Sequence, residues 1–135
     1  MVGGTWHASL WSSSAASWVS LHPAGASTSA AYAAWGTNQV GHARVGGLPH
    51  ASLWSGTAAS WVDLHTFLPS IFDVSFATGM SDDGINFYIT GFGYNSTMAR
   101  WEALHWTTPV PEPGTVSVLA LSIGTLVLRC RKSRR

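Results

Sequence analysis

An internal repeat limits what this chain can fold into more than any other feature of its sequence. Residues 7–12 (HASLWS) recur 43 positions later as residues 50–55, and residues 15–22 recur at the same offset as 58–65. A degenerate third copy starts at residue 103. A period of this length is typical of four-stranded propeller blades and also of HEAT-type helical repeats, so the sequence predicts an array of similar units.

The residue pattern within the repeat favours strands over helices. Residues 6–11 place their even-numbered side chains, all apolar, on one face of an extended chain. The small residues at 12–16 predict a hairpin loop. Residues 30–35 and 39–45 predict a second hairpin, because glycines interrupt this stretch too often for a helix. We therefore expect a mainly β fold with four short antiparallel strands in each unit.

The β-repeat region spans residues 1–108, with copies near 3–49 and 50–102. Its later part predicts strands at 74–79, 87–94 and 99–106, with an Asp-Gly turn after the first of them. This order of strand, turn and strand, followed by Ala99-Arg100-Trp101, resembles the short HAF-type repeats of bacterial propellers. The resemblance implies a propeller-like array.

The array is too short to close into a ring. The body holds about two and a half units, whereas propellers need four to eight blades. Oligomerisation, a marginally stable fragment or a truncated reading frame would each account for this. The start of the chain favours truncation, because residues 1–8 contain neither the charged nor the apolar region of a signal peptide. The alternative is that the C-terminal segment alone directs the chain to a membrane.

The tail, residues 109–135, has three parts in order: a Pro-rich hinge at 109–114, an uncharged run at 115–128 and a basic end. As a helix the run is about 20 Å long, against about 30 Å for the hydrocarbon core of a bilayer. Cations at its end can reach the headgroups and favour the cytoplasmic side, so we expect a transmembrane helix and not a buried core helix. These cations are Arg129, Arg131, Lys132, Arg134 and Arg135.

This order resembles the PEP-CTERM sorting domain of exported bacterial proteins, which is also known as the ice-binding protein C-terminal domain. The sorting motif consists of Val110, Pro111, Glu112, Pro113 and Gly114. The resemblance covers a fifth of the chain and implies export across the inner membrane, anchoring by the helix in membrane lipid, and processing near the motif by an exosortase. It also implies surface display together with extracellular polymer.

Charge and cysteine content exclude several classes of protein. Five of the seven cations lie in the basic end, so residues 1–128 hold two arginines against six acids. A weakly acidic body without a basic patch is not expected to bind nucleic acid. Cys130 is the only cysteine, which excludes an internal disulfide. Its role is open, because a bystander thiol, lipidation and pairing with another chain all fit its position between two arginines.

No pattern of catalytic or metal-binding residues stands out. The repeat itself explains the paired histidines, and no His-x₃-His or His-Glu-x-x-His spacing occurs. Serine, histidine and aspartate are present without the Gly-x-Ser-x-Gly elbow of a hydrolase. The acids at 82–83 lack the spacing of a calcium loop and predict a turn. We therefore expect no enzymatic activity, no cofactor and no metal.

Tryptophan is the remaining candidate for ligand binding. Trp11 and Trp18 recur as Trp54 and Trp61. Indole rings can stack on sugars, so these four are possible contacts to an extracellular polysaccharide, although strict recurrence favours packing between units. We expect an exported, membrane-anchored β-repeat protein of structural type, displayed in the periplasm, on the cell surface or outside the cell. The alternative is an adhesin or glycan-binding propeller module.

Overall fold

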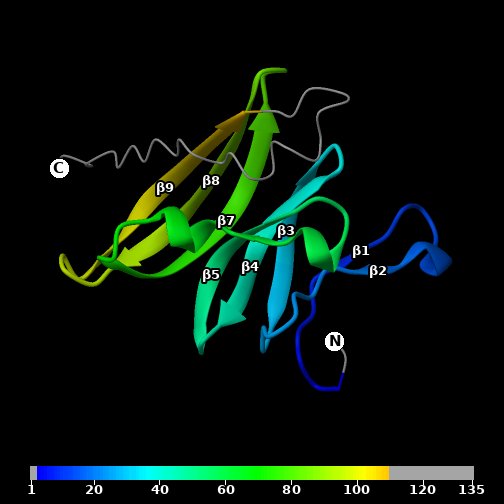
Figure 1. Cartoon of the computed structure of the whole chain (residues 1–135), viewed down its shortest axis with the longest axis horizontal. Coiled ribbons are helices and arrows are strands. Elements are labelled where there is room, and N and C mark those ends of the chain that lie inside the picture. The colour runs from blue at the N-terminus through cyan, green and yellow to red at the C-terminus, as the bar shows by residue number, and fades with distance from the viewer. Residues whose placement is uncertain (1–2, 110–135) are drawn as a thin grey trace.

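The computed structural model describes residues 3–109, and these residues form a mainly β structure, as predicted (Figure 1). Antiparallel strands form three sheets of two, four and three strands. The strands are β1 (Ser9–Leu10), β2 (Val19–Ser20), β3 (Ser29–Trp35), β4 (Asn38–Val45), β5 (Leu48–Trp54), β6 (Val62–Asp63), β7 (Phe72–Asp82), β8 (Asn86–Asn95) and β9 (Arg100–Pro109).

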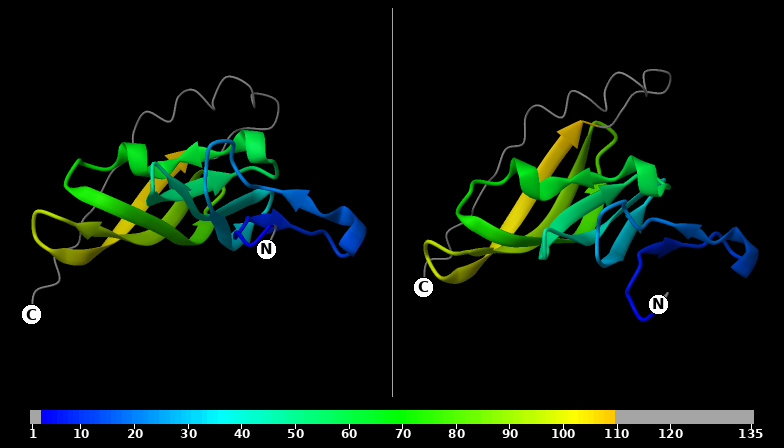
Figure 2. Two further views of the ribbon diagram at one scale, coloured as in Figure 1. Left: turned by 90° about the horizontal axis from the view of Figure 1, so that it is seen from below. Right: turned by 60° about the horizontal axis from the view of Figure 1, so that its bottom comes forward.

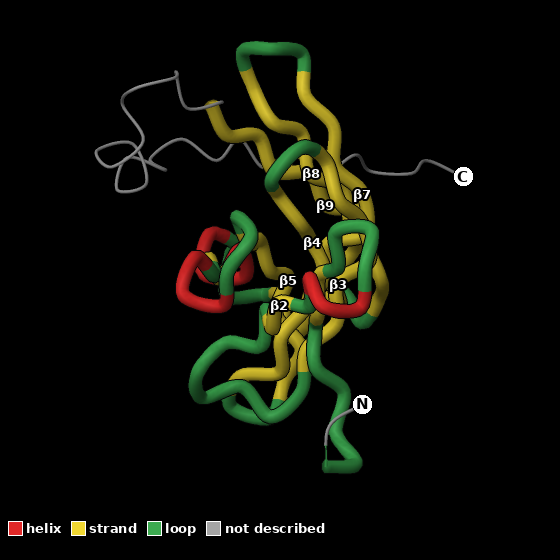
Figure 3. The backbone as a smooth tube through the Cα atoms, turned by 90° about the vertical axis from the view of Figure 1, so that its right-hand side faces the viewer, coloured by secondary structure: helices red, strands yellow, loops and turns green. Residues whose placement is uncertain are grey.

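The three sheets follow one another in chain order. The β1–β2 hairpin lies at one end, the β3–β4–β5–β6 sheet lies in the middle, and the β7–β8–β9 sheet lies at the other end (Figures 1 and 2). Three short 3₁₀ segments lie in the loops: η1 (Ala15–Ser17), η2 (Ala58–Ser60) and η3 (Leu64–Phe67) (Figure 3). Within residues 3–109 no helix has the length and apolar character needed to cross a membrane. The predicted helix at 115–128 lies outside the described residues.

The sequence repeat produces the same local structure twice. Ser9 pairs with Ser20 in the first copy, and Ser52 pairs with Asp63 in the second. Each hairpin loop contains a 3₁₀ turn, η1 or η2. In both loops one serine hydroxyl, that of Ser17 or Ser60, accepts a backbone N–H at 2.7 Å and donates to a carbonyl at 2.6 Å. The loops are therefore braced internally by equivalent bonds.

The boundaries of the sheets differ from those of the sequence repeat. The first copy does contain four strands, β1 to β4, but they belong to two sheets. The middle sheet takes β3 and β4 from the first copy, whereas nearly all of β5 and the whole of β6 come from the second. The predicted first strand at 6–11 is also shorter, since only Ser9–Leu10 pairs with β2. The repeated block thus forms a separate two-stranded sheet in the first copy and the last two strands of the middle sheet in the second.

A second equivalence relates β3–β4–β5 to β7–β8–β9. In both sheets the first strand bulges at the same place, between Ala31 and Ala33 and between Ala77 and Gly79. Opposite each bulge a glycine, Gly41 or Gly91, lies so close to the first strand that a Cβ there would overlap a carbonyl oxygen. The two sheets therefore share one register, in which β9 takes the place of β5.

The core is built from one repeated contact. Ala8, Leu21 and Trp54 are buried together where the β1–β2 hairpin meets the middle sheet. Their counterparts Ala51, Leu64 and Trp106 are buried where the middle sheet meets the β7–β9 sheet. Phe72, Ala77, Ile89, Leu104 and Val40 enlarge this second cluster. Full burial of a large apolar side chain contributes about 2 to 3 kcal/mol, so each tryptophan anchors one junction.

Candidate functional site

Two features of the described residues bring chemically versatile side chains together, and the first is a pair of histidine clusters. His7 stacks on His22 with ring centroids 3.8 Å apart, and His50 stacks on His65 at 4.3 Å. Nδ1 of His22 lies 2.8 Å from Oγ of Ser29. In the second cluster Nδ1 of His65 lies at the same distance from Oγ of Ser75.

The bonding within the clusters assigns them a structural role. Oγ of Ser29 accepts the N–H of Ala8 at 2.9 Å, and Nε2 of His22 lies 3.0 Å from the carbonyl oxygen of Ala26. Because a carbonyl only accepts, Nε2 bears the proton and Nδ1 accepts the serine hydroxyl. Both serines are buried, at 1% exposure or less, so neither hydroxyl is open to a substrate. Each cluster joins two neighbouring sheets.

A catalytic Ser-His-Asp arrangement is not formed, although all three residue types meet at the second cluster. Oδ2 of Asp63 lies 2.8 Å from Nδ1 of His50, whereas Ser75 contacts His65. The carboxylate and the hydroxyl thus contact two different imidazoles, and no single ring links them. Among residues 3–109 no group of three side chains is placed to hold a metal ion.

Burial affects the protonation of these clusters. It lowers the pKa of His22, and the neighbouring His7 lowers it further, against a smaller raising effect of the Ala26 carbonyl. Burial also lowers the pKa of His65, followed by the effect of His50, while Asp63 opposes both. Both rings are therefore held neutral at neutral pH, consistent with the tautomer that the hydrogen bonds require.

The second feature is a row of aromatic rings on the face of the β7–β9 sheet opposite to the buried side chains of Ala77, Ile89 and Leu104. We call it the outer face. Phe92 stacks on Phe76 at 5.0 Å and contacts Trp101 edge to face at 5.5 Å. Tyr94 contacts the same indole at 5.3 Å. The row continues through His42 on β4, 5.1 Å from the ring of Phe76.

Strand alternation creates this row. On β8 the side chains of Tyr88, Thr90, Phe92 and Tyr94 share one face, and those of the intervening residues point into the core. The intervening residues include two glycines, at 91 and 93, which let the inner face pack closely. The sequence contains this signal as large residues that alternate with glycine at 90–94, a pattern that is independent of the 43-residue period.

The predicted ligand-stacking tryptophans divide into two groups. Trp54 is completely buried, so it has no ring face available to a ligand. Trp61 is partly buried and donates its indole N–H to Oγ of Ser52 at 2.9 Å. Trp11 and Trp18, at the same positions of the first copy, are 57% and 49% exposed. In the second copy, Trp54 is buried with Ala8 and Leu21, and Trp61 packs against this cluster. These two tryptophans therefore pack between units.

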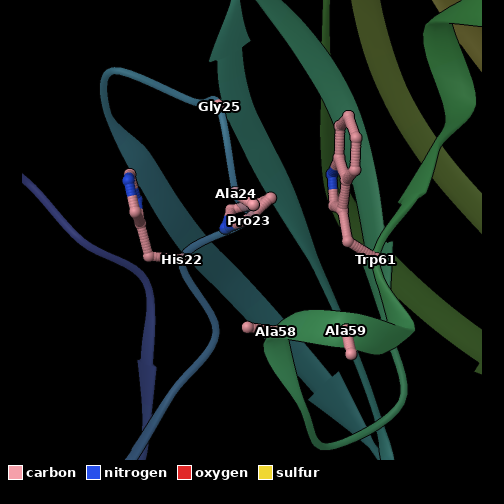
Figure 4. Close-up of a pocket in the computed structure, with 7 residues that line it drawn as sticks. All are labelled: His22, Pro23, Ala24, Gly25, Ala58, Ala59 and Trp61. Carbon is pink, nitrogen blue, oxygen red and sulfur yellow. The ribbon is translucent and has the colours of Figure 1, made fainter.

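A shallow depression lies between the connection from β2 to β3 and η2 (Figure 4). It is lined by His22, residues 23–25, Ala58, Ala59 and Trp61, with the imidazole and the indole on opposite sides. Both nitrogens of His22 and the indole nitrogen are already hydrogen-bonded. The depression is therefore mainly apolar and offers no side chain suited to acid–base chemistry.

The sorting motif at 110–114 and the basic end at 129–135 lie outside the described residues, as does Cys130. Comparison of the chain with family models, with curated proteins and with solved structures found no match. The outer face of the β7–β9 sheet is thus the candidate site that the positions and contacts of the described side chains support.

Proposed function

We propose that this chain is an exported bacterial β-repeat protein, held in the cell envelope by its C-terminal segment. One observation supports this most directly: the hinge, the apolar run and the cations of the tail occur in the order of a PEP-CTERM sorting segment. The run is apolar enough to partition into lipid, and the basic end favours the cytoplasmic side. The partners proposed for the tail are inner-membrane lipid and an exosortase.

The body is proposed to be part of a propeller-like array. Equal registers in the middle and terminal sheets, together with the repeated Ala–Leu–Trp contact, support successive units stacked face to face. Such arrays act mainly through extended surfaces. A hydrolase role is not proposed, because the serines bonded to His22 and His65 are buried among the described residues.

Membrane fractionation tests the anchoring. With a signal peptide placed before residue 1, the full chain is expressed in a bacterium that has an exosortase and compared with a chain lacking residues 110–135. The full chain is expected to enter the membrane fraction or reach the surface in processed form, and the shortened chain to remain soluble in the periplasm. Identical distribution of the two chains would refute the proposal.

A matched variant separates anchoring from processing. Replacing Pro111, Glu112 and Pro113 by alanine leaves the apolar run and the cations intact. This variant is expected to stay in the membrane at full length, since only the exosortase motif has changed. Processing of the variant at the same rate as the original chain would mean that an exosortase does not read the motif.

A binding role for the body is the second candidate, and the exposed aromatic rings of the outer face favour it over a purely structural one. Contiguous exposed apolar surface on a soluble domain commonly marks an interaction site. Phe92 and Trp101 are 40% and 56% exposed and are in contact with each other.

A further inference from the structure

Within residues 3–109 no further sheet packs on the outer face, and the face differs from the equivalent surface of the middle sheet. In the middle sheet Val40 pairs with Leu53, and both pack against the β7–β9 sheet. At the same register of the terminal sheet Thr90 pairs with His105. Two apolar side chains that are covered by a neighbouring sheet are thus replaced by two polar ones. This exchange is what a terminal unit of a repeat array needs, and a further stacked unit would bury both polar groups.

The rings beside this polar pair form a continuous platform. Phe76 lies opposite Phe92, and Tyr94 lies opposite Trp101, so the registers of three strands hold the four rings on one surface. Backbone pairing fixes their positions, and little conformational entropy is lost when such a surface binds a partner. Tyr88 stacks on His105 at 5.8 Å and extends the platform along β8.

Charge is absent from the register positions of this face. Arg100 and Glu102 pair with each other, Nε to Oε1 at 2.7 Å, and by strand alternation they belong to the opposite face. Asp82 and Asp83 lie at the strand end, where they accept the indole N–H of Trp35 and the hydroxyl of Tyr88. Arg44 lies close enough to His42, at the edge of the row, to lower the pKa of that histidine, and it donates Nη1–H to the carbonyl oxygen of Gly47. The register positions of the face itself carry no cation for an anionic lipid surface or a nucleic acid, so they suit an uncharged ligand.

We propose that the outer face binds a neutral polysaccharide, whose sugar rings stack on the exposed rings of Phe92 and Trp101, with Phe76 supporting Phe92 from the neighbouring strand. The apolar C–H faces of a pyranose suit an aromatic surface, and its hydroxyls can bond to the side chains of Thr90 and His105. Contacting ring centroids lie 5.0 to 5.5 Å apart, so an extended glycan touches more than one ring. This inference rests on the binding role proposed for the body and names its ligand class.

The test measures binding of the purified full-length chain, in mild detergent, to cellulose, chitin and a soluble β-glucan, with heparin as a charged comparison. Binding to at least one neutral polymer and not to heparin is expected. Trp101→Ala is expected to weaken this binding about tenfold, whereas Trp101→Phe keeps most of it because a ring remains. Thr90→Val tests the hydroxyl contact and is expected to weaken binding several-fold.

Trp6→Ala is the control, because Trp6 is also an exposed tryptophan, at 66% against 56%, but lies in the segment before β1 and outside the β7–β9 sheet. It is expected to bind as the original chain does, with all variants unfolding at the same denaturant concentration. The proposal is overturned if no neutral polymer binds, if Trp101→Ala binds unchanged, or if Trp6→Ala weakens binding equally. If glycan binding is absent and Trp101→Ala abolishes self-association or vesicle binding, the proposal is also overturned. The outer face would then bind a second copy of the chain or a lipid surface. These results do not depend on residues 110–135, so failure here is distinct from failure of the anchoring proposal.

Discussion

At the scale of single residues, the two copies of the hairpin loop reach one backbone conformation with different side chains. Ser13 has φ of 65°, and its counterpart Gly56 has φ of 83°. A left-handed conformation costs a non-glycine residue roughly 1 to 2 kcal/mol, whereas glycine adopts it freely. The loop therefore stores strain in the first copy and none at the equivalent place in the second.

Ser13→Gly is expected to stabilise the protein, because it relieves this strain. Glycine has more conformational freedom in the unfolded chain, and this offsets part of the gain. The free energy of unfolding is therefore expected to rise by about 0.5 to 1 kcal/mol. Urea unfolding measures the difference. Gly56→Ser is the reciprocal control and should destabilise by a similar amount, since a Cβ there meets only the carbonyl oxygen of Thr37 at 3.9 Å. Equal stability of all three proteins would contradict the assignment of strain.

The two anchoring tryptophans also differ at this scale. Nε1 of Trp106 donates to the carbonyl oxygen of Leu64 at 3.2 Å. Nε1 of Trp54 has no acceptor within the described part of the chain. A buried donor without an acceptor costs about 1 to 3 kcal/mol, so the junction with the β1–β2 hairpin is the weaker of the two.

At the scale of elements, the central strands β4 and β8 depend on glycine for close pairing with the strands before them. A Cβ at Gly91 would overlap the carbonyl oxygen of Phe76, and one at Gly41 would overlap that of Ala30. Because the obstacle is backbone and not a movable side chain, the sheet must separate locally to admit a methyl group.

Gly91→Ala is therefore expected to destabilise the protein by about 3 kcal/mol, the upper range for overpacking. Gly79→Ala is the matched comparison in the neighbouring strand. There a Cβ meets only Oγ1 of Thr90, at 2.8 Å, and this side chain can rotate away. The comparison variant should lose less than about 1 kcal/mol, measured by chemical unfolding. If Gly79→Ala lowers the free energy of unfolding more than Gly91→Ala does, the pairing of Gly91 with Ala77 between β7 and β8 is wrong.

Strand positions could largely be read from the sequence, and sheet membership could not. The frequent glycines at 36–47 predicted strands at 30–35 and 39–45, and the structure forms this hairpin as β3 and β4. Alternation describes one strand and its two faces, whereas pairing depends on which edges come together in space. For this reason the units expected at 3–49 and 50–102 do not coincide with the sheets.

At the scale of the whole molecule, the histidine clusters connect the sheets and make their association depend on pH. The folded-state pKa of His22 and of His65 lies below the ordinary value of 6.5. Between the folded and unfolded pKa values the unfolded chain binds more protons, so the free energy of unfolding rises with pH in that window. The contribution is complete above pH 6.5 and is lost as pH falls through the folded pKa values.

The protein is accordingly expected to have constant stability near pH 7.5 and a lower urea midpoint at pH 5.5. The double variant His22→Gln with His65→Gln should show a smaller difference between the two pH values, because two of the rings with a lowered pKa are gone. His42, whose pKa is lowered by burial and by Arg44, keeps its own contribution in this variant. Thr90→Val, which changes the outer face without changing a titratable group, is the control and should keep the full difference. An unchanged pH dependence in the double variant would assign the effect to other groups.

The sequence by itself determined that the chain repeats, that its body is built of strands, and where the hairpin loops lie, because repetition and alternation are local properties. Only the tertiary structure decided which surfaces are covered. Trp11 and Trp54 lie in identical hexapeptides, yet one is 57% exposed and the other is completely buried. Burial depends on whether a neighbouring unit supplies the matching Ala and Leu, as Ala8 and Leu21 do for Trp54, and no local pattern contains that information. For the same reason the sequence did not predict the outer face. Val40 and Thr90 occupy the same register position, and only the tertiary structure shows that Val40 is buried and Thr90 exposed.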